Sequence, residues 1–217
     1  NVWITDVGLH QVIKYDSTGK EMMVLGKKGK PGSDSYHFNL PTDIAVSEDG
    51  SFYVSDGYGN SRIIKFSKDG TYLFEWGTFG KNKNEFNIPH GLDLDNKGNV
   101  YVADRENNRI QKFDSLGNFI TEWKSKSNGQ LYSVNVNNHD NYILGIDYIG
   151  LENLIPIGSD IIYFDLDLNE KSRFGRSGLY DGQKARYHDI QIDKKGNIYA
   201  GDILNNSIQK FRLINKN

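Results

Sequence analysis

Two histidines that lie in matching contexts are the residues of this sequence best suited to metal chemistry. His90 lies in the run Ile88-Pro89-His90-Gly91-Leu92, and His188 lies 98 residues later in the run Arg186-Tyr187-His188-Asp189-Ile190. Imidazole is a common ligand of Zn²⁺, and a catalytic zinc typically has three protein ligands and one open position. The two rings can share an ion only if the fold brings them together. Otherwise they are two separate histidines that bind water.

The separation of the two histidines is twice the period of an internal repeat. Four apolar, strand-like segments end in an aspartate, and these aspartates are separated by 50, 48 and 98 residues. The segments are Val2–Asp6, Phe52–Asp56, Val100–Asp104 and Ile198–Asp202. Each is followed by a polar turn and a second apolar run, such as Arg109-Ile110-Gln111-Lys112-Phe113. Because the last interval is doubled, a diverged copy must lie within it, and Tyr142–Asp147 is the candidate.

Four antiparallel strands in every repeat of about 40–50 residues are typical of one blade of a β-propeller. The sequence therefore predicts an all-β propeller, because an ordinary sandwich of short strands gives no reason for a fixed spacing. The blade motif resembles the NHL repeat. Five second strands and four inner strands are visible, which predicts about four and a half blades in one domain, residues 1–217. The natural ring is expected to have six blades, with an N-terminal blade missing upstream of Asn1.

Composition narrows the choice of partners. The formal net charge of −2 offers no broad basic surface for nucleic acid, and no stretch approaches the length of a membrane span. The absence of cysteine excludes disulfides and thiolate metal ligands. We expect a monomer that binds a small-molecule or peptide ligand. The compartment stays open, since any export signal would precede Asn1.

The innermost strands of a propeller line its central channel. Alignment of the repeats predicts a ring of side chains around the axis, made of Thr42, His90, Ser133 and His188. A third histidine is expected in the strand upstream of Asn1, and three imidazoles would suit zinc. Asp189 points to the other side of its strand from His188. It could hold a hard cation such as calcium, or cap a neighbouring turn.

More specific motifs accompany the repeat. They are Ser55-Asp56-Gly57-Tyr58-Gly59-Asn60-Ser61-Arg62, Ile88-Pro89-His90, Val102-Ala103-Asp104-Arg105-Glu106-Asn107-Asn108-Arg109-Ile110-Gln111 and His188-Asp189-Ile190. They follow the order found in peptidylglycine α-amidating lyase, and the sequence resembles that family from Asn1 to about Phe211. The similarity is weakest between Ser125 and Tyr180.

This resemblance implies a six-bladed propeller that cleaves a peptidyl-α-hydroxyglycine into a peptide amide and glyoxylate. It implies zinc on the axis, bound by three histidines of which His90 and His188 are two, and calcium nearby with Asp189 as a ligand. Tyr58 matches the tyrosine that takes the hydroxyl proton, and Arg105 matches an arginine that lines the active site.

The implied chemistry is coherent. Zinc makes a carbinol hydroxyl easier to deprotonate, and Tyr58 can act as a base if zinc and Arg105 lower its pKa. Substrate binding is assigned to Arg105 and to Arg186, which stands where the family commonly has an apolar residue. Local alternatives remain: Tyr58 could be an exposed turn residue, and Arg105 could pair with Glu106 or Asp104.

Two other functions compete with the lyase. A non-catalytic NHL propeller would bind a protein or peptide on its loop face. A propeller lactonase would place acidic and amide ligands for calcium on the axis, whereas the ring expected here carries histidines.

Overall fold

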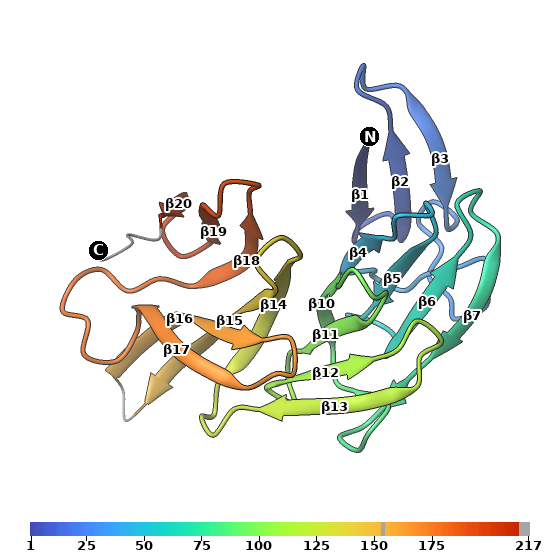
Figure 1. Cartoon of the computed structure of the whole chain (residues 1–217). Helices are drawn as coiled ribbons and strands as arrows, with labels where there is room; N and C mark the ends of the chain where they lie inside the picture. The colour runs from blue at the N-terminus through green and yellow to red at the C-terminus, as the bar shows by residue number, and fades with distance from the viewer. Residues whose placement is uncertain (153–154, 213–217) are drawn as a thin grey trace.

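The protein forms five β-sheets that follow one another around an arc (Figure 1). The structure is a computed structural model and describes residues 1–152 and 155–212. Within that part of the chain all regular elements are strands, so no helix is present that could span a membrane. Three sheets have four strands and two have three, in agreement with the predicted four and a half blades.

The strands of each blade are consecutive in the sequence and pair antiparallel. Blade 1 is β1 (Val2–Asp6), β2 (Gln11–Tyr15) and β3 (Glu21–Leu25). Blade 2 is β4 (Asp43–Val46), β5 (Phe52–Asp56), β6 (Arg62–Phe66) and β7 (Tyr72–Trp76). Blade 3 is β10 (Pro89–Leu94), β11 (Val100–Asp104), β12 (Arg109–Phe113) and β13 (Phe119–Lys124). Blade 4 is β14 (Gln130–Asn137), β15 (Tyr142–Glu152), β16 (Ile155–Asp165) and β17 (Glu170–Arg176). Blade 5 is β18 (Tyr187–Ile192), β19 (Ile198–Asp202) and β20 (Ser207–Phe211). A short parallel pair, β8 (Thr78–Phe79) and β9 (Glu85–Phe86), joins blades 2 and 3.

Tight turns with glycine close the outer hairpins of the blades. Gly70 precedes β7 and Gly117 precedes β13, with φ of +80° and +81°. This left-handed region is accessible to glycine at little cost, and it lets the chain reverse within a few residues.

The apolar core lies between neighbouring blades. Tyr53 of β5 and Tyr101 of β11 are almost fully buried. Their hydroxyls donate to carbonyls of the following blade, at Ser115 and Leu166, with both distances 2.9 Å. The repeated tyrosine thus fastens one blade to the next by apolar contact and by a hydrogen bond.

The first strands of blades 2 to 5 lie side by side on the inner edge of the arc. Strand β14 packs against both β10 and β18, and these two strands carry His90 and His188. The histidines therefore come from non-adjacent blades, as the spacing predicted.

A β-bulge recurs at one position of the inner strands. The register shifts between Pro89 and Gly91 in β10, between Leu131 and Ser133 in β14, and between Tyr187 and Asp189 in β18. A bulge leaves one residue unpaired and redirects its side chain. The unpaired residues are His90, Tyr132 and His188. The prediction of Ser133 in this ring is therefore wrong by one residue, and Tyr132 occupies that place.

Candidate functional site

His90 is held between two oxygen atoms in the centre of the arc. Its Nδ1 lies 2.8 Å from the carbonyl oxygen of Tyr132, and its Nε2 lies 2.8 Å from the hydroxyl of Tyr58. A carbonyl can only accept, so Nδ1 carries the proton and Nε2 presents its lone pair. Burial, helped by the nearby His188, lowers the pKa of His90 to about 3. The ring is thus neutral at physiological pH, which is the form that binds metals.

His188 approaches His90 across the intervening strand. The ring centroids lie 4.7 Å apart with an interplanar angle of 81°, and burial also lowers the pKa of His188. Imidazole nitrogens bind zinc at about 2.0–2.1 Å, so two ligand rings must come about this close. Among residues 1–152 and 155–212, however, no set of three or more His, Cys, Asp or Glu side chains is arranged to hold a metal ion.

Tyr58 reaches His90 from the turn after β5. Its backbone N–H donates to Leu40, and at the preceding Gly57 a Cβ would overlap the carbonyl oxygen of Pro89. Glycine therefore allows the turn to pack against the strand that carries His90. Burial raises the pKa of Tyr58, while Arg105 acts in the opposite direction. Tyr58 is not an exposed turn residue, because its hydroxyl is bonded to His90.

Arg105 lies beside two aromatic rings and one carboxylate. Its Cζ is 5.4 Å from the ring centre of Tyr58 and 5.3 Å from that of Tyr132. Its Nε and Nη2 lie 2.9 and 2.8 Å from Oε1 of Glu106. The ion pair considered from the sequence is present, and it coexists with the contact to Tyr58.

Tyr132 is the residue that sequence reasoning missed. Its ring centroid lies 5.2 Å from that of His90 and 5.3 Å from that of His188. Arg186 donates to its hydroxyl at 2.6 Å and also lies 4.8 Å from the ring centre of Tyr148. The sequence suggested matching Tyr132 to Tyr187, which puts Ser133 opposite His188, whereas the strand registers match Tyr132 to His188.

Asp189 lies in a small cavity of about 180 Å³ next to the histidines, where Asp43 and Ser133 also lie. Its Oδ1 accepts hydrogen bonds from the hydroxyl of Ser133 and the N–H of Ile190, both at 2.8 Å. Burial, with repulsion from Asp189, raises the pKa of Asp43 to about 8. Two carboxylates that share a cavity suit a hard cation. The position of Asp43 was readable from the sequence, because Thr42-Asp43 aligns with His188-Asp189.

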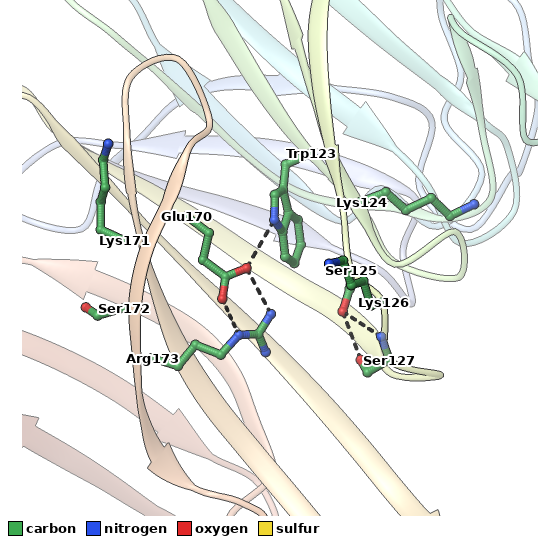
Figure 2. A pocket seen from close by; sticks show the side chains of 9 residues that line it. All are labelled: Trp123, Lys124, Ser125, Lys126, Ser127, Glu170, Lys171, Ser172 and Arg173. Atoms are coloured by element: carbon green, nitrogen blue, oxygen red, sulfur yellow. Dashed lines mark hydrogen bonds and ion pairs between the residues drawn. The ribbon is translucent and has the colours of Figure 1, made fainter.

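A second hollow lies on the outside of the molecule, between the outer strands β13 and β17. Figure 2 shows that Glu170 there bonds both Trp123 and Arg173. Arg173 also pairs with the buried Asp147 at 2.9 Å. These groups satisfy one another, and the axial side chains described above are absent from its lining. The candidate site is therefore the axial cluster.

Comparison with known proteins agrees with the fold. The family described as NHL repeat matches residues 38–66 and 86–113. The fold is also that of virginiamycin B lyase from Staphylococcus aureus, with a TM-score of 0.64, 16% identity, and coverage of 98% of this chain and 62% of that one. An identity this low shows the fold alone. The class of protein is thus an NHL-repeat β-propeller.

Within that class, the chain resembles the α-amidating lyases. It is 36% identical to peptidyl-glycine alpha-amidating monooxygenase A of Xenopus laevis, over 97% of this chain and 23% of that protein. It is 47% identical to the probable peptidyl-alpha-hydroxyglycine alpha-amidating lyase of Caenorhabditis elegans, over 52% of this chain and 33% of that one. NHL repeat-containing protein 3 of Homo sapiens is 34% identical over 99% of this chain and 63% of its own length. The chain thus spans about a quarter of the monooxygenase that it matches.

Proposed function

We propose that the protein is a zinc-dependent lyase that cleaves the C–N bond of an α-hydroxyglycine to give an amide and glyoxylate. The observation that carries this proposal is the convergence of His90, His188 and Tyr58, with ring centroids of the histidines 4.7 Å apart and Tyr58 at 2.8 Å from Nε2 of His90. The lyase names of the relatives support the same reaction class.

The histidines fit a metal for a reason that lies in their hydrogen bonds. The N–H of His90 Nδ1 is bound to a backbone carbonyl, which fixes the ring and directs the lone pair of Nε2 inward. His188 offers a second nitrogen, and Asp189 with Asp43 offers oxygen ligands for calcium beside it. Bound at the histidines, zinc would supply positive charge that favours loss of a proton from the substrate hydroxyl.

The proton balance assigns Tyr58 its role. The hydroxyl of the substrate loses its proton to Tyr58, the C–N bond breaks, and the carbinol carbon becomes the aldehyde of glyoxylate. The leaving amide nitrogen takes up that proton from Tyr58, which returns the tyrosine to its starting state. Because burial raises the pKa of Tyr58, this residue needs the positive charge of Arg105 and of a cation to act as a base.

Metal analysis and an assay for glyoxylate test the proposal together. We expect zinc to co-purify with the protein and Tyr58→Phe to lower kcat by about 10²–10⁴-fold, the usual contribution of a general base. Tyr36→Phe is the matched control, because Tyr36 is an exposed residue of a different loop. Absence of both zinc and glyoxylate would refute the lyase.

A binding module is the second candidate. The similarity to NHL repeat-containing protein 3 extends over 99% of this chain, and that name specifies no reaction. If this alternative holds, the protein binds a peptide without releasing glyoxylate, and Tyr58→Phe leaves binding unchanged.

A further inference from the structure

Two guanidinium groups, those of Arg105 and Arg186, lie close to the axial cluster. One of them is paired with a carboxylate and the other is not. Cζ of Arg105 lies 5.3 Å and that of Arg186 lies 5.6 Å from the ring centre of Tyr132. The substrate of the proposed reaction carries a carboxylate next to the carbon that reacts. Both arginines contact the tyrosine that contacts the two histidines, so we compare which of them is free to bind this carboxylate.

Arg105 is already paired. Both its Nε and its Nη2 bond one oxygen of Glu106, at 2.9 and 2.8 Å. Glu106 is itself held by Gln130, whose Nε2 donates to the same oxygen at 2.7 Å. A substrate carboxylate at Arg105 would have to displace Glu106 or lie beside it, and like charges at that distance repel.

Arg186 has no such partner. Among the described residues no carboxylate forms an ion pair with it, and its Nη2 donates only to the hydroxyl of Tyr132 at 2.6 Å. Its Nε is buried and has no hydrogen-bond acceptor. A buried donor left unpaired destabilises the protein, and a guanidinium edge binds a carboxylate through two parallel hydrogen bonds.

The surroundings of Arg186 hold it in place without neutralising it. Its Cζ lies 4.8 Å from the ring centre of Tyr148 and 5.6 Å from that of Tyr132. Aromatic rings attract a cation but leave its N–H groups free for an anion. The ring of Tyr132 also contacts both histidines, so the same aromatic side chain touches the guanidinium and both imidazoles.

We propose that Arg186 binds the carboxylate of the α-hydroxyglycine substrate, and that Arg105, held in place by its ion pair with Glu106, acts instead on Tyr58. The positive charge of Arg105 opposes the rise that burial causes in the pKa of Tyr58. The proposal rests on the lyase function inferred above. A rotation of the guanidinium off Tyr132 turns Nε and one Nη toward the incoming carboxylate. Arg186 is then a specificity residue, and the preferred substrate is the free acid.

The kinetic test compares N-acetyl-α-hydroxyglycine with its uncharged methyl ester. The unmodified protein prefers the acid. Arg186→Gln raises KM for the acid about 10–100-fold, leaves kcat within a few-fold, and removes the preference for the acid. Arg105→Gln lowers kcat and keeps the preference. Arg176→Gln, which removes an arginine stacked on Tyr180, is the matched control and changes neither. Retained preference in Arg186→Gln, or lost preference in Arg105→Gln, overturns the assignment.

A binding measurement separates this proposal from the lyase itself. Titration calorimetry with N-acetylglycine, which has the carboxylate but no hydroxyl to react, is expected to show binding that Arg186→Gln abolishes and Arg186→Lys partly restores. Thermal melting confirms that the variants are folded. If the protein binds N-acetylglycine through Arg186 but releases no glyoxylate, the lyase fails and the carboxylate site stands. If N-acetylglycine does not bind, or binds Arg186→Gln equally well, the carboxylate site is refuted whatever the activity.

Discussion

Blades 3 and 4 each bury an aspartate, but the arginine that pairs with it comes from a different strand in each blade. In blade 3, Asp104 at the end of β11 is fully buried and pairs with Arg109 of the next strand at 2.7 Å. In blade 4, the equivalent Asp147 pairs instead with Arg173 of the outer strand at 2.9 Å. The buried carboxylate is kept, but its arginine has moved by one strand.

The strand registers show that the charges have been exchanged. Ala103 pairs with Ile110 in blade 3 and Ile146 pairs with Ile161 in blade 4, which makes Asp160 the counterpart of Arg109. Likewise Gln111 pairs with Glu122 and Ile162 with Arg173, so that Arg173 stands in the place of Glu122. The positions of Arg109 and Glu122 in blade 3 are thus taken by Asp160 and Arg173 in blade 4, and the arginine that pairs with the buried aspartate comes from the outer strand there.

Removing Arg109 or Arg173 tests the difference between the two blades most directly. Arg109 is 2% exposed, and its guanidinium also binds Glu122 and three backbone carbonyls. Arg109→Met leaves Asp104 buried and unpaired, and we expect it to lower the free energy of unfolding by about 3–5 kcal/mol in urea denaturation. Arg173 is 30% exposed while Asp147 is buried, so solvent screens this pair from the arginine side, and Arg173→Met should cost only about 1–3 kcal/mol.

Arg62→Met is the matched variant for this experiment. Arg62 pairs with the buried Asp56 of blade 2 in the arrangement of blade 3, and its loss should resemble that of Arg109. Equal costs for Arg109→Met and Arg173→Met would show that the two arrangements are energetically the same, against our interpretation.

Restoring the blade 3 arrangement inside blade 4 sharpens the comparison. Arg173→Glu alone makes Asp147 and Asp160 face a third carboxylate and should destabilise the protein. Adding Asp160→Arg places the cation where blade 3 has it, and we expect a favourable coupling of about 1–3 kcal/mol in a double-mutant cycle of unfolding free energies. A coupling near zero would mean that the side chains at positions 160 and 173 do not interact energetically. Asp160→Arg alone provides the fourth corner of the cycle.

This exchange explains how far the fold could be predicted from the sequence. The aspartate at the end of each second strand, including Asp147, was identified because its apolar run and spacing are retained. The similarity faded after Ser125 because the Arg-Ile element that begins strands β6 and β12 depends on an arginine that blade 4 carries elsewhere. A pairing between neighbouring strands is not visible as a linear motif.

The residues of the candidate site also divide into those that the sequence predicted and those that it could not. The approach of His90 and His188 follows from the repeat period alone, since equal spacing places them on non-adjacent inner strands. Tyr132 could not be assigned, because a β-bulge shifts the side-chain alternation by one residue and its presence depends on the backbone pairing of β14 with β15. The unpaired state of Arg186 likewise depends on which carboxylates the fold brings near it.

Blades 3 and 4 also differ in the side chain that joins each of them to the following blade. On the inner strand of blade 3, Asp93 accepts the N–H of Val136 from blade 4 at 2.8 Å. The equivalent residue of blade 4 is Asn135, whose Oδ1 accepts the N–H of Ile192 from blade 5 at 3.1 Å. One contact between blades therefore uses an ionisable group, whereas the next uses a neutral amide of the same shape.

Asp93→Asn makes the first contact chemically equivalent to the second. Burial raises the pKa of Asp93 from 3.8 to about 6. A carboxyl with a raised folded-state pKa contributes stability that is complete below pH 4 and is lost as the pH rises through 6. The variant lacks this titration, so we expect it to gain stability relative to the natural protein between pH 4 and pH 7.5, by about 1–2 kcal/mol after allowance for partial exposure. Urea midpoints at several pH values measure the gain, with Asp69→Asn in an exposed turn as the control. Parallel curves for the natural protein and Asp93→Asn would show that the carboxyl is ionised throughout and that the two contacts between blades respond to pH alike.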